Sequence, residues 1–313
     1  MAQRKIGIIG VGKIAVDQHI PAIRASADWD LHATANLVPV PVDGVAHTLT
    51  DYHDLLANAD IEAVAICTPP QVRHRIARQA IAAGKHVLIE KPPAASLSAL
   101  VDLSHAARSA GVTLFTAWHS QYNKAVDAAV AELANSAIKR LKITWKEDVR
   151  HWHPGQTWIW RAGGFGVFDP GINALSIITR ILPQPLFVTA ANLAFPSNCD
   201  SPIAAELSFA SAAGEPGEEM SAVFDFRQTG PQSWDIDIET FDGRSLLLSS
   251  GGTKLAINGT SVIDAAPAEY PAMYARFADL IASRASLVDD GPFRLVADAF
   301  MLGRRTLVEP FYD

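Results

Sequence analysis

The sequence predicts an α/β protein: an N-terminal Rossmann domain, which is a doubly wound parallel sheet, followed by a C-terminal α+β domain with a large, mostly antiparallel open sheet. Up to about residue 120, short apolar runs alternate with helical patterns, as in βαβ units. Beyond residue 121 this alternation stops, and strands follow one another with few helices. We therefore expect two domains, residues 1–120 and residues 121–313.

The first domain shows clear strand and helix signals. Buried strands are predicted at residues 5–9, 31–36, 63–67, 86–89 and 113–117. Asp51 is a suitable N-cap for a helix over residues 52–57, and Gly111 a suitable end for a helix over residues 97–110. These helices separate the strands, as a parallel sheet requires.

Composition limits the classes of partner. The chain has 313 residues, of which 49% are apolar and 19% charged, which is enough for two hydrophobic cores. The formal net charge of −7 argues against nucleic acid or an anionic membrane as a partner. Because the first residues run directly into a strand and no segment has the length of a membrane span, we expect a cytoplasmic protein. Cys67 and Cys199 are expected to be free thiols.

A glycine motif follows the first strand and opens the first helix, which runs to about residue 25. It reads Gly10-Val11-Gly12-Lys13-Ile14-Ala15, the GxGxxA form of the dinucleotide fingerprint. Gly10 permits the tight turn, Gly12 lets the backbone approach a pyrophosphate, and Ala15 lets the helix pack closely on the strand. We expect a nicotinamide dinucleotide here, with Lys13 and Ile14 among its contacts.

The second strand ends at Asn36, the position that reads the adenosine ribose. An acidic residue there would bind the 2′-hydroxyl and repel a 2′-phosphate. The neutral Asn36 tolerates both groups, and no arginine follows closely to hold a phosphate. The cofactor is therefore expected to be NAD or NADP, with dual use allowed.

Polar residues follow the later strands of the first domain. Thr68 and Pro69 close one strand, Glu90 and Lys91 end the next, and His119 follows the last. Ligands bind outside the carboxyl ends of strands in an open parallel sheet, so these residues are expected to contact the cofactor. Lys91 is the first candidate for chemistry, and we expect a cis bond between it and Pro92. For His119, a substrate or nicotinamide contact and a purely structural role are equally open.

The second domain shows strand alternation and hairpin turns. Trp234, Ile236 and Ile238 alternate with acidic residues, which predicts an antiparallel strand with one buried face. Hairpin turns are predicted at residues 242–243 and 258–259. Helices at residues 169–181, 270–283 and 295–307 are expected to cover one side of this sheet.

Residues 145–160 combine tryptophans, carboxylates and histidines. Glu147, Trp152 and His153 are expected to bind a sugar, together with Trp234, because indole rings stack on the apolar face of a pyranose and its hydroxyls need polar partners. A metal site is the alternative, but no fixed ligand pattern emerges from His151, His153 and Glu147, and none is predicted.

Asp169 has two interpretations. Followed by Pro170, it is suited to cap the next helix. Asn173 lies one helical turn later on the same face, so both side chains can instead point towards one ligand.

These motifs together resemble the Gfo/Idh/MocA family of NAD(P)-dependent oxidoreductases. The segment AGKHVLIEKPP at residues 83–93 matches the family's EKP motif, whose lysine is catalytic and corresponds to Lys91. The segment GGFGVFDPGIN at residues 163–173 matches the glycines and the aspartate, Asp169, but Asn173 stands where the family has histidine. Pro70 and Arg73 also depart from the Asn and His that the family usually has at these positions.

Within this family, WKEDVRHWHPGQTWIW and GVFDPGINALSIITRILP resemble bacterial 1-dehydrogenases of L-arabinose and D-galactose. The resemblance implies oxidation of the aldose C1 hydroxyl to an aldonolactone, an aldose bound between the domains, no metal, and a homo-oligomer, most simply a dimer. It favours Asp169 as the base over a capping role, since an amide at Asn173 cannot take a proton. The catalytic set is therefore Lys91, Asp169 and Asn173.

Several alternatives stay open from the sequence. Asp169 or Lys91 could accept the proton, and no residue pattern separates L-arabinose from D-galactose. Other readings are a related oxidoreductase acting on another polyol or cyclic substrate, and a cofactor-binding sensor without turnover. The sensor would have no need of Lys91, Asp169 and a tryptophan-rich pocket together.

Overall fold

A computed structural model describes residues 3–214 and 217–312, and the chain divides into two units. The first unit contains the chain up to Trp118 together with Glu269–Asp290, and the second contains His119–Ala268 and the chain from Gly291 onwards. The sequence-based division at residue 120 differs from these units at residues 119–120, which it placed in the first domain, and at residues 269–290, which it placed in the second.

The first unit is built on a six-stranded parallel sheet in the order β3-β2-β1-β4-β5-β6. Its strands are β1 (Arg4–Ile9), β2 (Trp29–Ala35), β3 (His47–Leu49), β4 (Ala63–Ile66), β5 (His86–Glu90) and β6 (Leu114–Ala117). This is the Rossmann strand order, and it confirms the predicted fold class of the first domain. Strands β4, β5 and β6 are almost wholly buried and mostly apolar because helices cover both faces of the sheet.

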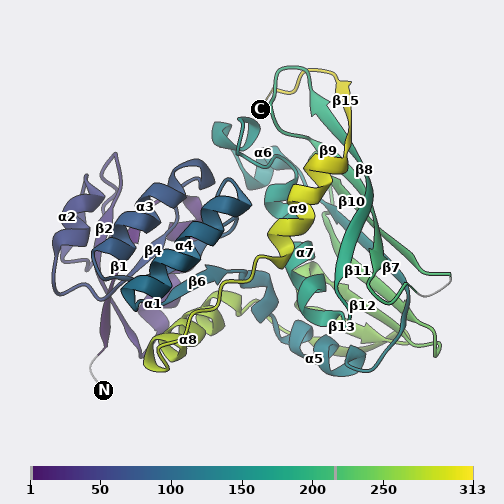
Figure 1. The fold of residues 1–313 in the computed structure, drawn as a ribbon, viewed down its shortest axis with the longest axis horizontal. Helices are drawn as coiled ribbons and strands as arrows, with labels where there is room; N and C mark the ends of the chain where they lie inside the picture. The colour runs from purple at the N-terminus through teal and green to yellow at the C-terminus, as the bar shows by residue number, and fades with distance from the viewer. Residues whose placement is uncertain (1–2, 215–216, 313) are drawn as a thin grey trace. The chain divides into compact units, whose positions relative to one another are not determined.

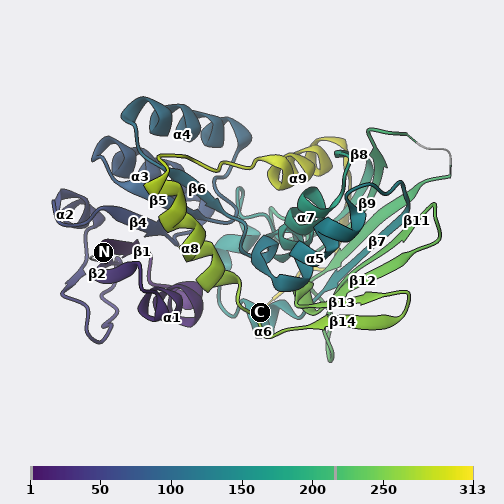
Figure 2. The ribbon, with the colours of Figure 1, turned by 90° about the horizontal axis from the view of Figure 1, so that it is seen from below.

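Six helices belong to this unit. They are η1 (Ala15–His19, a π-helix), α1 (Ile20–Ala25), α2 (Tyr52–Ala57), α3 (Pro70–Ala82), α4 (Leu97–Ala110) and α8 (Glu269–Ala282), counted over the described residues. Helices α3 and α4 lie side by side over one face of the sheet, and α1 and α8 over the other (Figure 2). The predicted signals at the ends of α2 and α4 are confirmed, since Asp51 accepts a hydrogen bond from the His53 amide and Gly111 is left-handed.

Helix α8 corrects one sequence-based expectation. The helix predicted over residues 270–283 exists, but it packs in the Rossmann unit and not on the antiparallel sheet. Phe277 stacks on Trp29 of β2 with ring centroids 5.2 Å apart, and also lies against Phe115 of β6. An amphipathic pattern specifies a buried face but not which sheet buries it, so the sequence could not assign this helix.

The second unit is built on a nine-stranded, mostly antiparallel sheet in the order β14-β13-β12-β11-β7-β10-β9-β8-β15 (Figure 1). Its strands are β7 (Ile138–Lys146), β8 (Leu186–Pro196), β9 (Ala204–Ser211), β10 (Glu219–Asp225), β11 (Ser233–Thr240), β12 (Ser245–Ser249), β13 (Lys254–Ile257), β14 (Thr260–Asp264) and β15 (Arg304–Val308). Among the strands of this sheet that the structure describes, only the β7–β10 and β8–β15 pairs are parallel. The open antiparallel sheet, the alternation in β11 and the two predicted hairpins are confirmed.

Three longer helices cover one face of this sheet: α5 (Lys124–Leu133), α7 (Phe168–Ile181) and α9 (Gly291–Leu302) (Figure 1). Shorter turns are η2 (His119–Tyr122), α6 (Val149–Trp152), η3 (Thr157–Trp160) and η4 (Ser250–Gly252). The helix predicted over residues 295–307 is too long, because α9 ends at Leu302 and β15 follows. Gly303 lies between them, and a Cβ there would lie 2.4 Å from the Ala299 carbonyl oxygen, so the close approach of the chain at this point requires glycine. In the part of the chain that the structure describes, no helix combines the length and apolarity needed to cross a bilayer.

Candidate functional site

The glycine motif lies where β1 and β4 end together. Gly10 has a φ of +92°, and a Cβ there would lie 2.9 Å from the backbone nitrogen of Thr68, so only glycine fits. At Gly12, apart from the residues adjoining it in the chain, no described atom lies within 4 Å of the position a Cβ would take. The protein itself leaves this space open, which is what the close approach of a cofactor pyrophosphate requires. The residues present therefore fit the dinucleotide that the motif predicts.

Asn36 connects the end of β2 to this motif. Its Oδ1 accepts a hydrogen bond from the Val11 amide at 3.0 Å, and its Nδ2 donates to the Val38 carbonyl at 2.7 Å. Both polar groups of the Asn36 side chain are therefore hydrogen-bonded to backbone atoms. The residue at this strand end carries an amide and not a carboxylate. Leu37 is 92% exposed beside it.

Other residues predicted to contact the cofactor lie within the glycine motif or directly after β4. Lys13 is exposed and forms an ion pair with Asp17 one turn later, while Ile14 is half-buried at the start of η1. Thr68 is half-buried, and Pro69 stands at the start of α3.

Glu90 and Lys91 end β5, and the bond from Lys91 to Pro92 is cis, as predicted. Lys91 is half-buried, whereas Glu90 is only 1% exposed and accepts hydrogen bonds from His19, Tyr270 and the Lys91 amide. Burial acts to lower the pKa of His19, but electrostatic interactions and hydrogen bonds with Cys67 and Glu90 outweigh it and raise the pKa to about 9.

Arg73 is a residue whose role the sequence did not reveal. It is 4% exposed on α3 and donates to the carbonyl oxygens of Glu90, at 2.8 Å, and of Pro92. The departure from the family pattern at this position was the only signal. The structure shows that the arginine supports the backbone of the EKP turn.

In the second unit, three predicted sugar ligands meet around Glu147, which is 5% exposed just after β7. Its Oε1 lies 3.2 Å from His153 Nε2, and its Oε2 accepts from the indole of Trp234 at 2.9 Å. Trp152 packs edge-on against Trp234 with ring centroids 5.1 Å apart and is 37% exposed. The structure therefore brings a carboxylate, an imidazole and two indoles together, as the sequence predicted.

Asp169 joins this group through His153. The carboxylate is 3% exposed, and its Oδ2 lies 3.9 Å from His153 Nδ1. The capping interpretation of Asp169 is wrong, because α7 begins at Phe168 with Val167 in the cap position and places Asp169 inside its first turn. Asn173 follows one turn later and is half-buried.

His119 does not belong to the cluster around Glu147 and Asp169. His119 is buried at the start of η2, with Nδ1 3.3 Å from the hydroxyl of Ser120. Over the described ranges, no three His, Cys, Asp or Glu side chains are placed to hold a metal ion.

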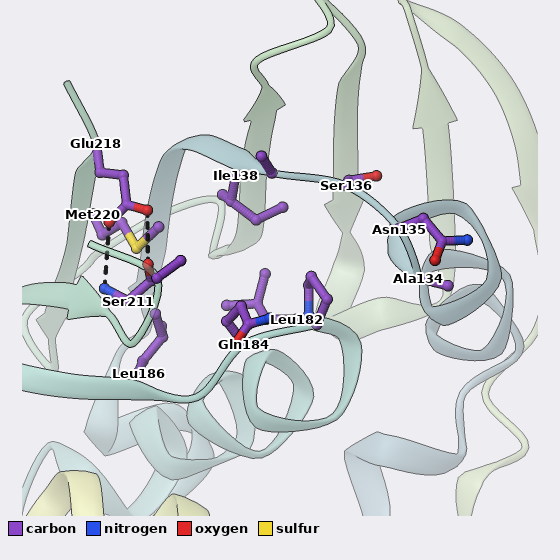
Figure 3. A pocket seen from close by; sticks show the side chains of 13 residues that line it. Ala134, Asn135, Ser136, Ile138, Leu182, Gln184, Leu186, Ser211, Glu218 and Met220 are labelled. Atoms are coloured by element: carbon purple, nitrogen blue, oxygen red, sulfur yellow. Dashed lines mark hydrogen bonds between the residues drawn. The ribbon is translucent and has the colours of Figure 1, made fainter. Parts of the chain in front are cut away.

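A pocket of about 390 Å³ opens in the second unit, and Figure 3 shows its lining. It lies at the start of β7, near Ile138, and after the last residue of α7, near Leu182. Glu147 and Asp169 occupy the opposite ends of these two elements. The polar contacts drawn in it are two hydrogen bonds from Ser211 to Glu218, one from the hydroxyl at 2.7 Å and one from the backbone amide at 3.4 Å. The pocket is therefore separate from the tryptophan and carboxylate cluster.

A parallel sheet of this order with a glycine fingerprint after its first strand, joined in one chain to an open antiparallel sheet, defines a two-domain, NAD-binding oxidoreductase. The chain belongs to the Gfo/Idh/MocA family. Residues 4–118 match the family model described as "Oxidoreductase family, NAD-binding Rossmann fold".

Relatives cover the whole chain. Galactose 1-dehydrogenase from Pseudomonas fluorescens is 45% identical over 312 residues, which is 99% of each sequence. The crystal structure of a D-galactose-1-dehydrogenase protein from Rhizobium etli is 51% identical, covers 100% of this chain and 99% of that one, and has a TM-score of 0.93. A 3-ketoreductase from Actinomadura kijaniata, solved with NADP, shares the fold at 18% identity and a TM-score of 0.83, covering 98% of this chain and 99% of that one.

Proposed function

We propose that this protein is an aldose 1-dehydrogenase that oxidises the C1 hydroxyl of D-galactose, L-arabinose or both to the aldonolactone, with NAD(P)⁺ as hydride acceptor. The observation that carries the proposal is the cluster of Glu147, His153 and Asp169 beside Trp152 and Trp234. The full-length similarity to galactose 1-dehydrogenases supports it.

The cluster has the chemistry of a sugar site. Trp152 and Trp234 offer indole surface for the apolar face of a pyranose, and Glu147 and His153 offer an acceptor and an imidazole for its hydroxyls. The indole N–H of Trp234 fixes the Glu147 carboxylate before any sugar arrives. A pre-oriented acceptor discriminates strongly between hydroxyl patterns, because a missing hydroxyl would leave it unpaired.

Asp169 is the base in the proposed reaction. It takes the proton of the C1 hydroxyl as the C1 hydrogen leaves with its electron pair, so that a carbonyl forms at C1 and the ring oxygen makes the product a lactone. His153 orients the carboxylate from one side. Asn173 can hydrogen-bond a hydroxyl but cannot accept the proton.

Lys91 is proposed to hydrogen-bond the reacting oxygen and to stabilise the negative charge that develops on it. A nicotinamide cofactor, held by Gly10, Gly12 and the residues that follow β2 and β4, would supply the hydride acceptor. His119 is proposed as a further polar contact near the nicotinamide.

Two arguments support the use of both cofactors and of both sugars. Asn36 presents no carboxylate against a 2′-phosphate, so NAD and NADP are both accommodated. L-arabinose and D-galactose share their ring stereochemistry and differ at the exocyclic carbon, so one cluster of ligands serves both. We also propose that the protein is cytoplasmic and forms a homodimer; sedimentation of the purified chain would test the homodimer.

The decisive experiment measures absorbance at the reduced-nicotinamide band with a panel of aldoses and both cofactors. We expect reduction with D-galactose and L-arabinose, and lactone as the product. No signal with any pentose or hexose would overturn the proposal.

A further inference from the structure

A buried polar network lies beneath the EKP turn of the first unit. It consists of Glu90, His19, Tyr270 and Tyr274, none of which is more than 1% exposed. His19 comes from η1, which follows the glycine motif, and the two tyrosines come from α8. Such complete burial excludes direct contact of these four side chains with a substrate.

The two oxygens of Glu90 have different tasks. Oε1 is 3.1 Å from His19 Nε2 and accepts from the Tyr270 hydroxyl at 3.0 Å. Oε2 accepts from the backbone amide of Lys91 at 2.7 Å. Oε1 is therefore hydrogen-bonded to buried side chains, whereas Oε2 is hydrogen-bonded to the backbone of Lys91.

The network contains an ion pair between His19 and Glu90. Since the pKa of His19 is raised to about 9, its imidazole carries a proton at neutral pH and pairs with the Glu90 carboxylate. The groups that face it are Cys67 after β4, Glu90 on β5, and Tyr270 and Tyr274 on α8, with Nδ1 2.7 Å from the Tyr274 hydroxyl. Burial raises the pKa of both tyrosines well above 10, so they remain neutral. A charge-assisted hydrogen bond in a dry site fixes Glu90 more firmly than neutral donors could.

Arg73 acts on the same turn from α3. Its guanidinium binds the carbonyl oxygens of Glu90 and Pro92, which belong to the residues before and after Lys91. The Lys91 backbone is therefore held at its amide by Glu90 and at both neighbouring carbonyls by Arg73.

We propose that His19 and Tyr270 are positioning residues for Lys91, acting through the Glu90 carboxylate. The inference rests on the proposed function, because it gives Lys91 its role in the reaction. The competing explanation is that the network only fastens η1 and α8 to the sheet. If the role were only structural, substitutions in the network would lower the thermal stability, but the kcat of the folded protein would not change.

Tyr270→Phe removes one hydrogen bond to Glu90 and keeps the ring. Tyr52→Phe is the matched control, because the Tyr52 hydroxyl also donates to a side chain in this unit, that of Gln79, away from Glu90. We expect Tyr270→Phe to lower kcat about tenfold with little change in the KM for the sugar, and Tyr52→Phe to leave both unchanged.

Amide hydrogen exchange provides a readout that does not depend on turnover. We expect exchange at the Lys91 amide to be about tenfold faster in Tyr270→Phe and unchanged in Tyr52→Phe. If the unaltered protein oxidises no aldose but this exchange result holds, the proposed function fails while the positioning of Lys91 stands.

A normal kcat together with normal Lys91 exchange in Tyr270→Phe would overturn the inference. Should that variant not fold, His19→Gln serves instead, since it removes the charge and is expected to give the same fall in kcat and the same faster exchange.

Discussion

The imidazole Nδ1 of His153, at the end of α6, lies 3.9 Å from the Oδ2 of Asp169, in the first turn of α7. The other ring nitrogen of His153 faces Glu147 at 3.2 Å. One imidazole therefore lies between two buried carboxylates and limits the orientations that each can adopt. In the proposed reaction, this imidazole is the partner that orients Asp169 as the base.

Asp169→Asn removes the proposed base while keeping the shape of the side chain. We expect kcat to fall on the order of a hundredfold or more, because an amide cannot accept the C1 hydroxyl proton. Cofactor affinity, measured by quenching of protein fluorescence, should hardly change. Asp237→Asn on β11, which removes a half-exposed carboxylate paired with Arg140, is the control and should turn over normally. Near-normal kcat in Asp169→Asn would leave this residue without a role as base.

Lys91→Met removes the charge of the EKP lysine and preserves much of its length. We expect kcat to fall at least as far as in Asp169→Asn, on the order of a hundredfold, because negative charge on the reacting oxygen loses its partner. Lys142→Met, an exposed position on β7, is the control for loss of a lysine. Retained activity in Lys91→Met, measured under saturating sugar and cofactor, would exclude the proposed role of Lys91.

Trp234→Phe removes the indole N–H that holds Glu147. We expect the KM for the sugar to rise about fivefold to tenfold, the equivalent of one hydrogen bond, with a smaller effect on kcat. Trp145→Phe is a matched control, because the buried Trp145 indole nitrogen has no hydrogen-bond partner among the described residues. It separates the loss of the donor from the loss of ring volume. Equal effects on KM in the two variants would argue against orientation of Glu147 by Trp234.

Local signals in the sequence were sufficient for much of the fold. Buried strands, the Asp51 cap and the Gly111 helix end depend on neighbouring residues, and the structure has each of them. The placement of α8 and the existence of β15 were missed because both depend on distant partners, such as Trp29 for α8 and β8 for β15. Periodicity identifies a helix or strand but not its neighbour in space.

The same distinction separates the site residues that were predicted from those that were missed. Glu147 and His153 stood out by residue type in an unusual stretch, and Trp234 as an aromatic residue of an alternating strand; the three do meet. His19 and Tyr270 gave no signal, because they reach Glu90 across 71 and 180 positions of sequence. Sequence motifs indicate residues that are candidates for ligand contact. The buried residues that support them, such as His19 and Tyr270, can be identified only from the three-dimensional structure.

The raised pKa of His19 predicts a pH dependence of stability. The folded state holds this proton up to a pKa of about 9, compared with an ordinary value of 6.5 in the unfolded chain. The contribution is therefore fully present below pH 6.5, declines as the pH rises towards 9, and is lost above it; its size is roughly 3 kcal/mol. Thermal unfolding followed by circular dichroism between pH 6 and 10 should show this decline.

His19→Gln is the test of that assignment, because glutamine cannot take up the proton. We expect this variant to have a lower melting temperature at pH 6 and a flatter dependence on pH up to pH 9. His53→Gln is the control: His53 is an exposed histidine on α2 that pairs with Asp51 at the surface, and its loss should leave the pH dependence unchanged. If the slope between pH 6.5 and 9 persisted in His19→Gln, another group would carry the titration and His19 would not be charged in the folded protein.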